Sequence, residues 1–131
     1  MIKKIDIRVA INIMLILLVL VLIYHLLILI ELIPYQIAWG GRLETRSQML
    51  AFESVSIGIN VIIMTIILLK GEYIKTRISV RVINILLWIL TVVFILNTVG
   101  NLISNNLLET IIFTPLTCIS AILCYRMAVE K

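Results

Sequence analysis

The segment VAINIMLILLVLVLIYHLLILI, residues 9–30, decides the fold because it contains no Asp, Glu, Lys or Arg. As a helix it would be about 33 Å long, enough to cross a hydrocarbon core of about 30 Å. Arg8 precedes it and Glu31 follows it. The segment is longer than the apolar part of a usual signal peptide and does not end in a small-residue cleavage pattern. We therefore expect it to be retained as the first membrane helix.

Three further apolar segments predict membrane helices near residues 52–69, 82–102 and 110–127. The chain has 131 residues, of which 63% are hydrophobic, whereas soluble domains are about 45–50% apolar. Four spans of about 20 residues leave little room for a domain outside the membrane. The sequence therefore predicts one transmembrane domain over residues 1–131, an all-α, up-down-up-down four-helix bundle in contact with the lipid bilayer.

The distribution of Lys and Arg predicts the orientation of this bundle. Nine of the eleven basic residues lie at the two termini or in the connection after the second span. Only Arg42 and Arg46 lie on the other side. Short cytoplasmic segments of membrane proteins carry an excess of Lys and Arg. We therefore expect a multi-pass protein of the cell membrane with both termini in the cytoplasm.

The first connection, residues 34–51, contains the sequence Trp39-Gly40-Gly41-Arg42, which this topology places outside the cell. Tyr35 and Trp39 have amphipathic rings that suit the headgroup region, so they are either simple anchors or the rim of a site. The two glycines form either an ordinary turn or a turn whose backbone N–H groups approach an anion beside Arg42.

Polar side chains follow helical spacing in all four spans and concentrate in the outer half of the membrane. Glu53, Ser56 and Asn60 form one such row. Polar groups inside a bilayer usually face protein or a wet cavity, so converging rows would build a polar pocket open to the outside. The candidate pocket residues are His25, Glu31, Tyr35, Trp39, Arg42, Glu53, Asn60, Asn97, Asn101 and Thr114.

Each of these residues also has a purely structural interpretation. His25 could hydrogen-bond a backbone carbonyl or Glu31. The two glutamates could be interfacial carboxylates paired with Arg42 or Arg46. The asparagines could hold helices together by hydrogen bonds, and the small residues Ser54 and Gly58 could bring helices close within one chain or in a homodimer.

Several functional classes find no support in the sequence. The net charge of +4 lies in short connections and forms no basic face with interleaved aromatic residues, so we expect no nucleic-acid partner. Cys118 and Cys124 have neither redox-pair nor metal-ligand spacing. We expect no metal and no cofactor.

Three strings in the chain resemble those of small bacterial integral membrane proteins with four spans. These strings are PYQIAWGGRL (residues 34–43), Phe52-Glu53 and FTPLT (residues 113–117). The resemblance covers nearly the whole chain and implies a bacterial inner membrane. It implies no activity, because that family has no assigned function.

The leading functional hypothesis is a protein that binds or moves a small solute or lipid headgroup through the outward-facing polar pocket. The alternative is an accessory subunit that sits beside a partner membrane protein in a larger complex. A membrane enzyme acting on lipid, with His25 and a glutamate as acid and base, is a third interpretation. No nucleophile motif or phosphate-binding loop supports it.

Overall fold

The computed structural model describes residues 4–34, 44–103, 107 and 109–130, and these form four long helices and no strands. The bounds of the long helices are α1 Ile7–Leu29, α2 Arg46–Lys70, α3 Val80–Leu102 and α4 Thr114–Val129; a short π-helical segment, η4 (Glu109–Phe113), precedes α4. All four helical spans are long and apolar enough to cross a membrane. The predicted all-α four-helix bundle is therefore confirmed.

Side-chain caps fix where three of the helices begin. Asp6, Thr45 and Ser79 accept hydrogen bonds from backbone N–H groups in the first turns of α1, α2 and α3. The cap at Thr45 makes α2 start six residues before the expected position 52. Residues 46–51, which the sequence assigned to the first connection, are therefore helical and continuous with the membrane span.

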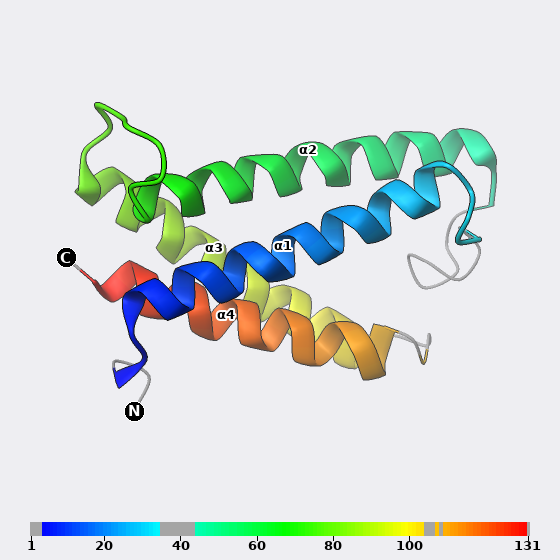
Figure 1. Cartoon of the computed structure of the whole chain (residues 1–131). Coiled ribbons are helices and arrows are strands. Elements are labelled where there is room, and N and C mark those ends of the chain that lie inside the picture. The colour runs from blue at the N-terminus through cyan, green and yellow to red at the C-terminus, as the bar shows by residue number, and fades with distance from the viewer. Residues whose placement is uncertain (1–3, 35–43, 104–106, 108, 131) are drawn as a thin grey trace.

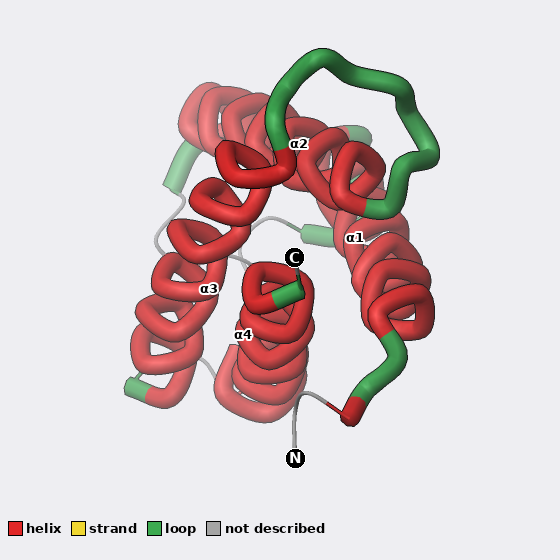
Figure 2. Tube along the Cα trace, turned by 90° about the vertical axis from the view of Figure 1, so that its left-hand side faces the viewer, coloured by secondary structure: helices red, strands yellow, loops and turns green. Residues whose placement is uncertain are grey.

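Successive helices run in opposite directions and form two hairpins, α1–α2 and α3–α4 (Figure 1). Viewed along the bundle, the four helices surround a common centre (Figure 2). We call the end where α1 begins and α4 ends the terminal end. The end where α1 ends and α2 begins is the loop end. The two hairpins lie close together at the terminal end and diverge toward the loop end (Figure 1).

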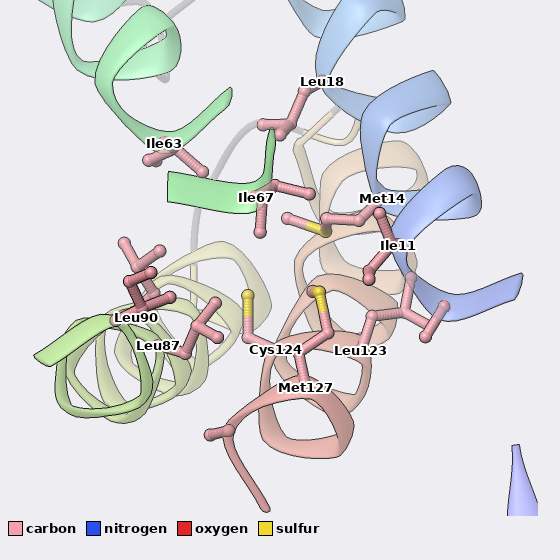
Figure 3. Close-up of a cluster of buried hydrophobic side chains, with 13 residues drawn as sticks. Ile11, Met14, Leu18, Ile63, Ile67, Leu87, Leu90, Leu123, Cys124 and Met127 are labelled. Atoms are coloured by element: carbon pink, nitrogen blue, oxygen red, sulfur yellow. The ribbon is translucent and has the colours of Figure 1, made fainter. Parts of the chain in front are cut away.

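The hydrophobic core lies toward the terminal end, where all four helices contribute buried side chains (Figure 3). Met14 from α1, Ile67 from α2, Leu87 from α3 and Met127 from α4 are completely buried. Most large apolar side chains on the other faces of the helices are exposed. Such exposure suits contact with lipid tails rather than water.

Three basic side chains connect the helices at the terminal end through backbone carbonyl oxygens. Arg8 of α1 donates to Gly71 O at 2.8 Å, and Lys70 of α2 donates to Glu130 O at 2.6 Å. Arg126 of α4 donates to Ile5 O, just before α1, at 2.6 Å. Carbonyl groups at helix C-termini have no partner within the helix and carry partial negative charge, so they favour cations. These bonds link α1 to α2, α2 to α4 and α4 back to the chain before α1.

The π-helical turn before α4 follows from Pro115. Proline has no N–H to bond the carbonyl four residues earlier, and its ring collides with that carbonyl. The backbone widens into η4, and α4 then starts with Pro115 in its first turn. The Thr117 hydroxyl donates to Phe113 O at 2.8 Å, which gives one carbonyl of this turn a partner inside the protein.

Replacing Ile67 by alanine should destabilise the bundle far more than the same change at Ile62. Ile67 is 0% exposed in the core, and Ile62, on the same helix, is 60% exposed. The cavity left at Ile67 should cost about 2–5 kcal/mol. The change at Ile62 should stay within about 0.5 kcal/mol, as for other surface substitutions. Equilibrium unfolding in mixed detergent micelles, followed by circular dichroism, measures both; equal losses would contradict the assigned core.

Candidate functional site

A cavity of about 510 Å³ lies between the two hairpins, on the loop-end side of the core. All four long helices contribute to its wall. Its polar lining residues are Tyr24 and His25 from α1, Glu53, Ser56 and Asn60 from α2, Asn97 and Asn101 from α3, and Thr117 and Ser120 from α4. The polar rows seen in the sequence therefore converge on one space. Five of the ten candidate residues line it.

Glu53 is the most deeply buried charged residue in this wall. Its side chain is 0% exposed, and one carboxylate oxygen, Oε2, lies 2.6 Å from Nδ1 of His25. Burial of an ionised carboxylate is costly unless it is paired and hydrogen-bonded. The contact joins α1 to α2. It is a hydrogen bond, so one proton must lie between Nδ1 of His25 and Oε2 of Glu53. The structural interpretation of His25 as a partner of a backbone carbonyl or of Glu31 is thus replaced by a pair with Glu53.

Aromatic side chains pack beside the imidazole of this pair. The ring of Tyr24 lies 5.8 Å from the His25 ring and 5.2 Å from that of Phe113, between ring centroids. Edge-to-face and tilted arrangements at these distances are favourable. Tyr24 and Phe113 also line the cavity, so they connect the two hairpins and hold the imidazole in place.

Several polar groups in and beside the cavity wall are satisfied within the protein. Asn60 donates from Nδ2 to Leu18 O at 3.1 Å and so links α2 to α1. The Ser120 hydroxyl donates to Leu116 O in its own helix at 2.8 Å. The Thr98 and Thr117 hydroxyls lie 2.9 Å apart across α3 and α4. The Asn60 bond and the Thr98–Thr117 contact support the interpretation that asparagine and hydroxyl side chains hold helices together.

Other polar side chains of the wall have no such partner. Asn97 and Ser56 line the cavity, and neither side chain makes a hydrogen bond to any residue in the described part of the chain. Asn101 uses Nδ2 in a long contact of 3.4 Å to Thr117 Oγ1. Asn97 and Ser56 are therefore available to a bound molecule.

Two candidate residues lie away from the cavity. Glu31 follows the end of α1, has a backbone φ of 64°, and pairs with Arg46 at 3.1 Å on the surface. Because α1 ends at Leu29, Glu31 lies beyond the helix and does not reach the cavity wall. The Thr114 hydroxyl is buried, does not line the cavity, and has no hydrogen-bond partner among the described residues. The remaining candidates, Tyr35, Trp39 and Arg42, lie outside the described residues.

Sequence reasoning did not select Thr117 and Ser120 as candidate site residues, although both line the cavity. Their spacing of three places them on one helical face, which is the available signal. No group of three or more His, Cys, Asp or Glu residues that could hold a metal ion occurs in the described part of the chain. The cavity can hold a molecule beside the Glu53–His25 pair. This carboxylate–imidazole pair can exchange a proton with the bound molecule.

No protein-family model, curated protein or solved structure matches the chain. The resemblance to small bacterial four-span proteins therefore stays a prediction. The four apolar helices identify a multi-pass membrane protein on length and composition. The cavity is the feature of the described residues that bears on its activity.

The pair of His25 with Glu53 should show strong energetic coupling in a double-mutant cycle. His25→Ala, Glu53→Gln and the double variant should give a coupling energy of at least about 1.5 kcal/mol, because the pair is buried. Glu31 and Arg46 form a matched control, since both side chains are exposed, and should couple by less than about 1 kcal/mol. Equilibrium unfolding in mixed micelles measures both cycles. Equal coupling in the two pairs would contradict the buried contact.

Proposed function

We propose that this membrane protein binds a small solute or lipid headgroup in the cavity between its two hairpins, and that binding is the basis of its activity. The observation that carries the proposal is the fully buried Glu53, paired with His25 on the wall of a cavity inside a membrane-spanning region. Insertion scales assign a cost of about 2.5–3.5 kcal/mol to a charged residue at the centre of a membrane helix. The cost is smaller nearer the ends of a helix, but ionisable residues inside membrane spans usually belong to binding sites or ion pathways.

Different groups of the wall would have different roles in binding. The Glu53 carboxylate and the His25 ring would set the charge of the site and accept or return a proton. Asn97 and Ser56 would supply hydrogen bonds, since neither uses its side chain elsewhere among the described residues. Tyr35, Trp39 and Arg42 are proposed to form the rim, with Arg42 paired to an anionic group of the ligand.

The proposed orientation puts the loop end outside the cell. It rests on the nine basic residues at the opposite end. Several of these are also structural: Arg8, Lys70 and Arg126 bond backbone carbonyls at the terminal end. In this orientation the site faces the outer leaflet and the packed core faces the cytoplasm.

The accessory-subunit alternative assigns a structural role to the same residues. The cavity polar groups would then be structural, and a partner membrane protein or second copy would cover an exposed helix face. Gly58 on α2 is exposed, and a Cβ atom added there would have no other atom within 4 Å. Under this alternative, loss of the Glu53 carboxylate would impair association without changing the amount of any small molecule bound.

A molecule bound in the cavity should co-purify with the protein and depend on Glu53. Native mass spectrometry of the wild-type protein in mild detergent should detect an added mass that extraction can identify. Glu53→Gln should lose this mass, because the substitution removes the negative charge and keeps the side-chain shape. Glu31→Gln is the matched control: it removes an exposed carboxylate that does not line the cavity.

Two results would count against this proposal. The first is a wild-type protein that carries no added mass after purification from native membranes and none after incubation with a lipid extract. The second is equal occupancy in Glu53→Gln and wild type when both unfold at the same temperature. Either result would favour the accessory-subunit alternative.

Reporter fusions should establish the orientation. Reporters that are active only in the cytoplasm should give a signal when fused after Lys75 and after Lys131, and none when fused after Gly41. The basis is the excess of Lys and Arg at the terminal end. A signal at only one of Lys75 and Lys131 would contradict four spans, and a signal only at Gly41 would reverse the orientation.

A further inference from the structure

The wall of the cavity is open on one side of the bundle. Among the described lining residues, those classed as exposed all come from α2 and α3, and none comes from α1 or α4. They are Ile59, Leu96, Asn97 and Gly100. Ile59 is 52% and Leu96 is 64% exposed. The cavity therefore opens sideways between α2 and α3, toward the space that lipid occupies around a membrane bundle.

A glycine keeps this opening wide. Gly100 lines the cavity, and a Cβ atom added there would have no other atom within 4 Å. α2 and α3 belong to different hairpins and are joined by the connection after Lys70 at the terminal end. The hairpins diverge toward the loop end (Figure 1), and Gly100 lies two residues before the loop-end terminus of α3.

Polarity changes along the cavity in the direction of the membrane normal. His25, Glu53 and Asn97 lie about 6–10 Å along their helices from the loop end, at about 1.5 Å per residue. Leu17, Leu18 and Ile63 of the wall lie deeper, about 17–26 Å from that end. The deepest polar group of the wall, Asn60, lies about 21 Å from that end and already bonds a backbone carbonyl. The available groups of Asn97 and Ser56 lie about 8 and 15 Å from the loop end, so the deep part of the wall offers no available hydrogen-bonding group among the described residues.

We propose that the cavity takes a bilayer lipid, which enters sideways between α2 and α3. Its head lies beside His25, Glu53 and Asn97, and one acyl chain extends past Ile59 and Leu96 into the deep, apolar part. This matches the direction of a lipid in the leaflet at the loop end, with its head outward and its tail toward the bilayer centre. The inference rests on the proposed binding function and adds to it the class of ligand and the route of entry.

A photoreactive lipid tests the route. The probe is a phosphatidylethanolamine with a diazirine near the end of one acyl chain, mixed into phosphatidylcholine vesicles that contain the full-length protein. After irradiation, cross-linked peptides are mapped by mass spectrometry. We expect cross-links on interior residues of the wall, such as Leu18, Thr117 and Ser120, which are buried from the bundle surface.

Two glycine variants make a matched pair for this experiment. Gly100→Leu places a side chain at the opening, and Gly58→Leu places the same side chain on an exposed face of α2 that does not line the cavity. Neither added Cβ meets an atom within 4 Å, and leucine favours helix over glycine, so both should fold. Interior cross-links should fall at least about fivefold in Gly100→Leu, because its side chain collides with the acyl chain, and stay unchanged in Gly58→Leu. Circular dichroism and thermal unfolding confirm that both variants are folded.

The cross-linking results test the route of lipid entry, and the Glu53-dependent mass tests the binding function. Cross-links confined to outward-facing residues such as Ile62 and Ile89 would overturn the lipid proposal, as would equal interior labelling in Gly100→Leu and wild type. If a Glu53-dependent mass still co-purifies in either case, the cavity binds a different ligand or fills by another path, and the binding function stands. If that mass is also absent, both proposals fail.

Discussion

Every polar group inside a bilayer needs a partner within the protein, because hydrocarbon offers no hydrogen bonds. This constraint governs both ends of the bundle. At the terminal end, Arg8, Lys70 and Arg126 satisfy carbonyl groups at helix ends and hold the helices together. Toward the loop end, Glu53 is satisfied by His25 from the neighbouring helix. Asn97 and Ser56 are exceptions, because their side chains form no hydrogen bond to any described residue.

The two halves of the bundle accordingly differ in packing. The terminal-end half is filled by large apolar side chains from all four helices (Figure 3). Arg8, Lys70 and Arg126 connect the helices at that end. The loop-end half contains the cavity, with its carboxylate–imidazole pair and its opening between α2 and α3. A packed half beside an open half suits a binding site that is supported by a scaffold.

Much of the fold was predictable because hydrophobic length and polar spacing are local properties of the sequence. Helical phasing placed Glu53, Asn60, Asn97 and Asn101 on faces that do meet at the cavity. The contact of His25 with Glu53 was not predictable, since it depends on the relative shift and rotation of α1 and α2. Glu31 was predicted to belong to the pocket, but α1 ends two residues before it in a backbone turn, and it pairs with Arg46 on the surface. The sideways opening depends on how far the hairpins diverge, which no single helix encodes.

The cavity is tested most directly by placing a cysteine at Ser56, on the cavity wall. Its reactivity toward a charged, water-soluble thiol reagent is measured in detergent. Cys118 is replaced by alanine, and the buried Cys124 is kept. A cysteine at Ile67 in the core serves as the unreactive reference. The cysteine at position 56 should react readily, because it lines the cavity, while the buried one at position 67 should not. Equal protection of both positions would mean that the bundle is closed beside Glu53, and would contradict the cavity on which the proposed function rests.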